Sequence, residues 1–556
     1  MVNTRSSGAK VTFSSQETKS HPRETPKRKK LTSSIEPVEW VPTVLEHVQL
    51  YTQGLQENSH VILLLPQEIE VSLSLWESFE LGEVSNTPSA ESDSSKLYLC
   101  YAGGEVWAWD TLKVESKWYL ALSAYRKDSL VHSIYEKYSN LGLIQLWEYD
   151  ASRDEKPTCI LCIGHEGDFC RQLRWLPFCL DGADSDHQHL LGMLLGCFGD
   201  GTLKVMRIKY DPLWKQRQPN EPIFVRSDVL FCFASPCDAI LITTECSSDG
   251  RWIIGGDTRG TLHLWNIKGN LKEVFIRNQK NGIYYQSFPA HQVPIRSLAS
   301  PRMQQDTINI QYPSKLSMPT SELIASGSMD GCIRIWNLHF PYRPLLEYRL
   351  GQSWIYQLEW RSSKELVAAL DDGSVRLLPV EESNKSSRVL ALHQGACWCV
   401  SISSHAESQR NTNLSISSGG ENGEWIYCHD SLWTSRKSKK SSCHPWRLAK
   451  VEMYSSQPEQ GKVAQLSNED SVRYSLSTFI HSSKNNIPDI AQYIQRPLST
   501  GACVPFPPSM AFHRVFHHFL PNDMKDTHPY SMILGAAFGD GWFLLGAMSS
   551  WLVQQL

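Results

Sequence analysis

The stretch Gly327-Ser328-Met329-Asp330-Gly331-Cys332-Ile333-Arg334-Ile335-Trp336 places an Asp-Gly pair directly before a strand that ends in bulky apolar residues. An X-Gly pair between two apolar runs is typical of a tight β-hairpin, because the turn needs a positive φ that glycine adopts without strain. The phrase recurs at Leu141-Gly142, Asp200-Gly201, Arg259-Gly260, Asp372-Gly373, Asn422-Gly423 and Asp540-Gly541. Seven such hairpins in one chain predict an architecture built from repeats.

The spacing of these turns, from 42 to 118 residues, indicates that each repeat is one propeller blade. A four-stranded blade takes about 40–45 residues, so the longer intervals must contain loop insertions. Seven blades close into a ring that leaves few exposed sheet edges. We therefore predict an all-β, seven-bladed β-propeller over residues 101–556, with a long polar insertion at 431–509 between blades 6 and 7.

The fourth repeat resembles the WD-repeat family of propellers. His291, Ser328, Asp330 and Trp336 resemble the family's hydrogen-bonded tetrad, with Ser two residues before the turn Asp and Trp six residues after it. The resemblance implies that these side chains link strands within a blade, so we interpret this Ser/His/Asp set as structural and predict no catalytic residues. The other repeats lack parts of the tetrad, and packing is expected to replace the missing polar links.

The composition favours a soluble, intracellular protein. The net charge of −4 argues against a globally basic nucleic-acid binder. No apolar run reaches the roughly 18 residues of a membrane span, and the polar N-terminus is not a secretory signal.

No motif in the sequence asks for a metal or cofactor. Cys159 and Cys162 have knuckle spacing, but they lie in a predicted strand, where positions three apart point to opposite faces, and no second pair is nearby. We expect buried thiols and no metal site. The Gly-rich stretch 255–260 lies between two strands, unlike a phosphate-binding loop, which leads into a helix. We expect neither a cofactor nor a small-molecule substrate.

The first 35 residues are predicted to be a disordered basic tail, because they are rich in Ser, Thr, Lys and Arg and almost free of bulky apolar residues. Residues 1–30 carry eight Lys and Arg against two acidic residues. The run Lys27, Arg28, Lys29, Lys30 after Pro26 resembles a nuclear import signal, and a merely solvated basic tail is the alternative. We favour nuclear import.

Residues 36–100 are predicted to be an extension that precedes the ring. Two strands are expected over 61–76, where Val71 to Trp76 alternates as a half-buried strand does. We expect one of them to pair with the last blade, at 511–556, and to close the ring, so that deletion of 1–80 should sharply lower thermal stability.

The insertion at 431–509 holds ten Lys and Arg and five acidic residues. It begins with the basic run Arg436, Lys437, Lys439 and Lys440, which Trp433 and Trp446 flank. Basic residues interleaved with aromatics can follow a nucleic-acid backbone, so this run is a candidate for nucleic-acid contact. A flexible loop with solvated charges is the alternative. Neither basic run could read a base sequence alone.

Blades 1 and 2 carry a narrower resemblance. Gly103 to Asp110 (GGEVWAWD), Asn140 to Glu148 (NLGLIQLWE) and Cys170 to Phe178 (CRQLRWLPF) resemble strands of the WD-repeat subunit of general transcription factor IIIC. This similarity is strongest over 101–208 and weaker beyond.

This second resemblance implies a nuclear, non-enzymatic scaffold. Its partners would be the other subunits of a multiprotein complex, and it would contact DNA indirectly or through basic loops at RNA polymerase III genes. A WD-repeat scaffold of another nuclear complex, in chromatin modification or ribosome assembly, remains an alternative. So does a cytoplasmic adaptor such as a ubiquitin-ligase substrate receptor, because the fold alone does not define the partner.

Overall fold

The computed structural model describes residues 48–549 with gaps, the longest at 82–95, 178–189, 210–220, 268–283, 430–445, 454–473, 479–511 and 520–529. The chain divides into the units Met1–Val41 and Pro42–Leu556, and all described residues belong to the second. One short helix, α1 (Val48–Thr52), is followed by β-strands.

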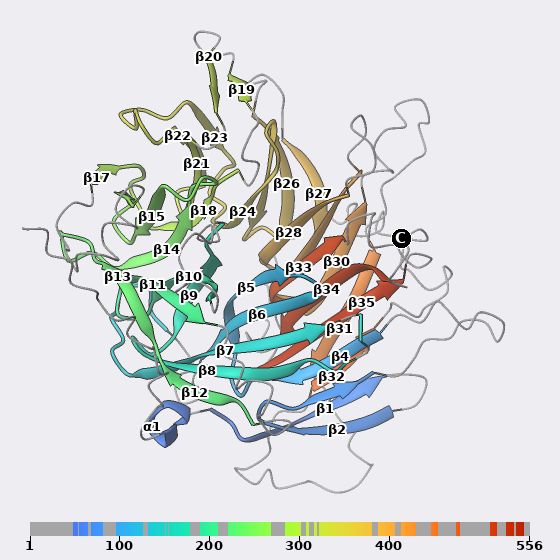
Figure 1. The fold of residues 1–556 in the computed structure, drawn as a ribbon. Coiled ribbons are helices and arrows are strands. Elements are labelled where there is room, and N and C mark those ends of the chain that lie inside the picture. The colour runs from blue at the N-terminus through green and yellow to red at the C-terminus, as the bar shows by residue number, and fades with distance from the viewer. Residues whose placement is uncertain are drawn as a thin grey trace, which may run out of the picture. The chain divides into compact units, whose positions relative to one another are not determined.

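The described residues of the second unit form seven sheets of four or more strands (Figure 1). In each blade the first strand named is the innermost and the last is the outermost. Blade 1 is β5 (Val106–Val114), β6 (Lys117–Ala124), β7 (Leu141–Asp150), β8 (Thr158–Glu166) and β12 (Ile223–Arg226); blade 2 is β9 (Cys170–Trp175), β10 (Leu190–Phe198), β11 (Leu203–Lys209) and β13 (Asp228–Phe233). Blade 3 is β14 (Leu241–Cys246), β15 (Trp252–Asp257), β16 (Thr261–Asn266) and β17 (Tyr284–Pro289); blade 4 is β18 (Ile295–Ala299), β21 (Leu323–Ser328), β22 (Cys332–Asn337) and β23 (Leu346–Arg349).

The last three sheets follow the same order. Blade 5 is β24 (Ile355–Ser362), β25 (Glu365–Leu370), β26 (Ser374–Pro379) and β27 (Arg388–Leu392); blade 6 is β28 (Cys397–His405), β29 (Asn413–Gly420), β30 (Glu424–His429), β31 (Trp446–Met453), β32 (Tyr474–Thr478), β1 (Asn58–Leu64) and β2 (Glu68–Ser74). Blade 7 is β33 (Phe512–Phe519), β34 (Tyr530–Phe538), β35 (Trp542–Ser549), β4 (Lys96–Tyr101) and β3 (Ser78–Glu80). A separate hairpin, β19 (Thr307–Ile310) and β20 (Leu316–Pro319), lies between β18 and β21 in sequence.

The innermost strands of the seven blades form a closed circle. Each contacts its neighbour in the order β5, β9, β14, β18, β24, β28 and β33, and β33 contacts β5 again. The prediction of an all-β, seven-bladed propeller is therefore confirmed.

Glycines in the predicted left-handed conformation make most of the hairpin turns. Positive φ is found at Gly201, Gly260, Gly331, Gly373, Gly423 and Gly541. The predicted hairpin at Leu141-Gly142 is wrong, because both residues lie within β7, which follows β6 only after a long connection. Gly142 serves close packing instead, since a Cβ there would lie 1.7 Å from the carbonyl oxygen of Asp168.

An N-terminal strand closes the ring, but it is not one of the two strands expected at 61–76. β4 pairs antiparallel with β35 along Lys96–Tyr101, and its Leu99 lies opposite Leu544. β1 instead runs parallel to β32 and, with β2, extends blade 6. The earlier strands alternate well, but their pattern carries no information about which sheet edge they meet.

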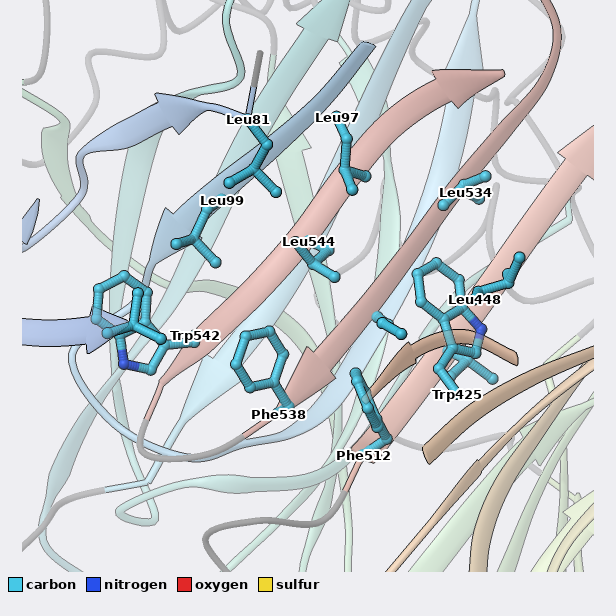
Figure 2. Close-up of a cluster of buried hydrophobic side chains, with 14 of the residues drawn as sticks. Leu81, Leu97, Leu99, Trp425, Leu448, Phe512, Leu534, Phe538, Trp542 and Leu544 are labelled. Atoms are coloured by element: carbon cyan, nitrogen blue, oxygen red, sulfur yellow. The ribbon is translucent and has the colours of Figure 1, made fainter. Parts of the chain in front are cut away.

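The hydrophobic core between blades 6 and 7 shows why β4 matters (Figure 2). Leu97 and Leu99 of β4 join Leu544, Phe538 and Trp425 in one buried cluster. The closing strand therefore supplies apolar side chains to the same core as the two blades that meet there.

The predicted insertion range also needs correction. β31 and β32 fall within 431–509, and β31 is the fourth strand of blade 6 rather than part of a loop. The basic tail at 1–35 and the basic run at 436–440 lie outside the described residues.

Candidate functional site

A network of buried hydrogen bonds holds blade 4 together. His291 Nδ1 lies 3.0 Å from a carboxylate oxygen of Asp330, to which it donates. The Ser326 hydroxyl donates to His291 Nε2 at 2.8 Å and accepts from Trp336 Nε1 at 2.8 Å. Burial alone would raise the pKa of Asp330, but the hydrogen bond from His291 and the charge of Arg334 outweigh it and hold the pKa below its ordinary value.

The assignment of Ser328 to this tetrad was wrong. Its hydroxyl donates to the carbonyl oxygen of Pro294 at 2.9 Å, away from the histidine. Ser326 and Ser328 lie two residues apart on β21 and therefore share a face of the sheet. Only Ser326 lies far enough along the strand to meet His291 and Trp336 together.

The order Ser326, His291, Asp330 resembles a nucleophilic triad, but its surroundings favour a structural role. Ser326 has no exposed surface, and its oxygen already accepts a hydrogen bond from the buried Trp336. A substrate carbonyl cannot reach this hydroxyl without unfolding the blade. This serine is therefore a strand linker.

Other blades use different polar links where the tetrad is incomplete. Lys204 bonds Asp200 at 2.9 Å in blade 2, and Arg376 bonds Asp372 at 2.8 Å in blade 5. His263 lies 3.1 Å from Asp257 in blade 3. The expectation that packing alone replaces the lost tetrads is wrong, since these turn carboxylates find basic partners four or six residues later.

A β-bulge lies near the start of every innermost strand. Ladder pairing skips one residue at Trp107, Arg171, Ile242, Arg296, Tyr356, Trp398 and His513, in blades 1 to 7 respectively. A bulge redirects a side chain out of the regular alternation of a strand. Repeated around a closed ring, it can direct one position per blade to the centre.

The bulged residues of blades 1 to 6, with Arg514 of blade 7, line a cavity of about 80 Å³, which we call the central pocket. Its lining residues are Trp107, Tyr125, Arg171, Gln172, Ile242, Arg296, Tyr356, Trp398 and Arg514. Ile295, next to Arg296, pairs with Ser328 just before the Asp330-Gly331 turn. The central pocket therefore lies at the end of the ring that carries the glycine turns.

Arg174, on the same inner strand as Arg171, has its charge compensated by two carboxylates. Arg174 reaches Glu245 of blade 3 at 3.2 Å and Glu359 of blade 5 at 3.4 Å, so it bridges the inner strands of three blades. Burial alone would lower the pKa of Arg174, but the two carboxylates outweigh it and raise the pKa above its ordinary value.

The arginines of the pocket itself have no such partners. Among the described residues, no carboxylate forms a salt bridge with Arg171, Arg296 or Arg514. Burial lowers the pKa of Arg296, and the charge of Arg171 acts in the same direction. Burial, with the charges of Arg174 and Arg296, lowers the pKa of Arg514 to about 10. The pocket concentrates positive charge in an environment that disfavours it.

Sequence reasoning did not find this pocket, and the basic runs that it proposed are not among the described residues. Lys27, Arg28, Lys29 and Lys30, and the run Arg436, Lys437, Lys439 and Lys440, are outside the described residues. The sequence signal for the pocket is weak, because each blade contributes one residue near the start of its inner strand and the type of that residue differs from blade to blade.

The paired cysteines lie together rather than on opposite faces. A bulge between β7 and β8 at Ile160 brings the sulfur atoms of Cys159 and Cys162 to 4.0 Å, and both are buried. Within the described ranges, no group of three or more His, Cys, Asp or Glu side chains is arranged to hold a metal ion. Of the helices described, none is long and apolar enough to cross a membrane.

Comparison with known proteins agrees with this geometry. The family model "WD domain, G-beta repeat" matches residues 282–337, which contain the hydrogen-bonded network of blade 4. The match covers one repeat, so over these residues the chain is similar to WD-repeat proteins, while the seven sheets show the β-propeller fold. The chain is also similar to "General transcription factor 3C polypeptide 2" of Pongo abelii, at 22% identity over 280 residues. The match covers 44% of this chain and 28% of that relative, so it spans little more than a quarter of the relative's length.

Proposed function

We propose that this protein is a non-enzymatic scaffold subunit of a nuclear, transcription factor IIIC-like complex. It would support promoter DNA binding at RNA polymerase III genes through protein–protein contacts. The observation that carries this proposal is the similarity to the transcription factor 3C polypeptide, together with the strand phrases of blades 1 and 2. A propeller suits this role because its ends and rim offer several surfaces to different partners.

Affinity purification of the tagged full chain from nuclear extract, followed by mass spectrometry, tests the proposal. We expect the other subunits of transcription factor IIIC in stoichiometric amounts. Recovery of chromatin-modifying, ribosome-assembly or ubiquitin-ligase subunits in their place would refute it.

The basic run at 436–440 supports a secondary role in DNA contact. Each phosphate contact that is lost should reduce the slope of log affinity against log salt by about 0.9. We expect replacement of Arg436, Lys437, Lys439 and Lys440 by glutamine to weaken DNA binding by the purified complex and flatten this slope, with assembly unchanged. Lost assembly with unchanged DNA binding would contradict this role.

A matched control removes the same number of charges from the same part of the chain. It replaces the scattered residues Lys462, Arg473, Lys484 and Arg496 by glutamine. Equal flattening of the salt slope by both variants would show that net charge, rather than the basic run, supplies the contact.

A further inference from the structure

The central pocket holds positive charge that the described residues leave uncompensated. Arg171 donates one guanidinium nitrogen to the carbonyl oxygens of Ser133 and Glu136, but its buried Nε has no partner. Arg296 lies over the ring of Tyr356 at 5.6 Å. Arg514 donates to the carbonyl oxygen of Trp107 and to Gln357 Oε1. All these acceptors are neutral, although the same ring gives Arg174 two carboxylates.

Such an arrangement is costly unless an anion completes it. Arg171, Arg296 and Arg514 are half-buried. Like charges gathered in such a site repel each other, and a charge that has lost part of its water is stabilised by an opposite one. Two described carboxylates, Asp371 and Glu421, lie near Tyr356 at the same end of the ring. Neither of these two forms a salt bridge with the three arginines. The chain therefore keeps a cationic cavity where it could have neutralised one.

The walls of the cavity restrict which anion fits. Trp107, Tyr125, Tyr356 and Trp398 surround the guanidinium groups, and the space is about 80 Å³. A carboxylate on a short side chain can enter such a space, while a nucleic-acid duplex is far too wide. Guanidinium groups bind carboxylates through parallel, charge-assisted hydrogen bonds, and aromatic walls strengthen these bonds by excluding water.

Exposed aromatic residues around the cavity indicate that the anion belongs to a protein. Tyr135 is 62% exposed and lies two residues from Ser133, the contact of Arg171. Trp354 is 40% exposed and packs against Tyr356. Tyr, Trp and Arg together are the residue types that dominate binding energy at protein interfaces.

We propose that the central pocket receives an acidic side chain from a segment of a partner protein, bound by Arg171, Arg296 and Arg514, while Tyr135 and Trp354 pack against the residues beside it. The pocket is built whichever complex contains the protein, so this proposal does not rest on the transcriptional role above.

Fluorescence anisotropy with purified full chain tests the proposal. The probes are a fluorescein-labelled peptide of eight glutamates, the matching peptide of eight glutamines, and a labelled single-stranded oligothymidylate of eight nucleotides. Arg296→Gln should weaken binding of the glutamate peptide by about tenfold, the loss expected for one charge-assisted hydrogen bond. Arg296→Lys, which keeps the charge, should restore part of this loss.

The control variant is Arg343→Gln, which removes one exposed charge from the loop that follows β22. We expect it to change peptide affinity by less than about twofold, as for a solvated surface charge. Equal weakening by Arg296→Gln and Arg343→Gln would overturn the proposal, since the peptide would then bind through overall charge. So would a loss of oligothymidylate binding that matches or exceeds the loss of peptide binding in Arg296→Gln.

Folding of the variant is checked by its melting temperature, which should not fall, because Arg296→Gln removes repulsion from Arg171. Arg171→Gln provides a second variant with the same expected tenfold loss. A negative peptide assay would not contradict the proposed membership of the complex. Recovery of a different complex would not contradict the proposed binding of an acidic side chain in the central pocket.

Discussion

Replacing Ser326 by alanine should destabilise the propeller more than replacing its neighbour Ser328. Ser326→Ala removes the hydroxyl that joins His291 Nε2 and Trp336 Nε1, each at 2.8 Å. Trp336 is only 3% exposed, so its indole N–H then has no acceptor. The imidazole of His291 also loses the hydroxyl that donates to it. At roughly 1–3 kcal/mol for each unsatisfied buried group, we expect a total loss of about 3 kcal/mol.

Ser328→Ala removes less. Its hydroxyl donates to the Pro294 carbonyl, which still accepts from the backbone N–H of Met329 at 3.2 Å. The bond that it accepts from the Asp330 N–H is long, at 3.3 Å. The expected cost is about 1 kcal/mol. Each variant therefore lacks one hydroxyl relative to the wild type, and both hydroxyls lie on the same face of β21.

Differential scanning calorimetry of the full chain at one scan rate measures the difference. With about 2.1 cal/mol/K of unfolding entropy per residue over roughly 500 residues, 1 kcal/mol corresponds to about 1 °C. Ser326→Ala should therefore lower the melting temperature by about 3 °C and Ser328→Ala by about 1 °C. In a Trp336→Phe background, Ser326→Ala should cost less, because the orphaned N–H is already gone. Equal harm from Ser328→Ala and Ser326→Ala would refute the role of Ser326, as would a Trp336→Phe background that makes no difference.

Three further outcomes are expected. Deletion of 1–101 removes β4 and its buried side chains, whose apolar burial contributes about 10 kcal/mol. It should therefore lower the melting temperature further than deletion of 1–80, which leaves β4 in place. Equal melting temperatures of the two deletion variants would show that β4 does not close the ring. Burial lowers the pKa of His165 to about 4, so the unfolded chain binds the proton more readily and stability should fall as the pH drops from about 6.5 toward 4. The loss between pH 7 and 5 is about 2 kcal/mol by linkage, and comparing the melting of wild type and His165→Gln at both pH values isolates it; identical pH profiles would contradict the assignment. Replacing Lys27, Arg28, Lys29 and Lys30 by alanine should abolish nuclear accumulation of the fluorescently tagged chain, whereas unchanged localisation would leave the run as a solvated tail.

The number of blades was predictable because the signal is local. A hairpin turn needs positive φ within a few residues, and six of the seven predicted turns contain such a glycine. The hairpin predicted at Gly142 was wrong because an X-Gly pair also occurs where a strand needs close backbone packing. Sequence spacing alone does not separate these two uses of glycine.

The choice of tetrad serine shows a different limit. Ser326 and Ser328 both lie on β21 and share one face, so alternation cannot choose between them. The choice depends on how far along the strand His291 arrives from the preceding blade. That is a matter of tertiary register, which the pattern of one strand does not contain.

The central pocket was the least predictable feature. Arg171 and Arg514 are more than three hundred residues apart in sequence, and only ring closure brings them to one cavity. The one-residue shift at each bulge also moves residues such as Arg171 and Arg296 out of the alternation from which burial is predicted. A single arginine among strand residues then looks like an ordinary solvent-facing position.

These features together explain how the ring can diverge so far from its repeat pattern. The glycine turns fix the hairpins, and a carboxylate at several turns keeps a basic partner even where the tetrad is lost, as Asp200 does with Lys204. Neither device involves the bulged position at the start of the inner strand. That position is free to be Ile242 in one blade and Arg296 in the next without cost to the hairpin. The centre of the ring can therefore gather like charges at positions that the fold does not need for its own stability, which is where we expect selection for a partner to act.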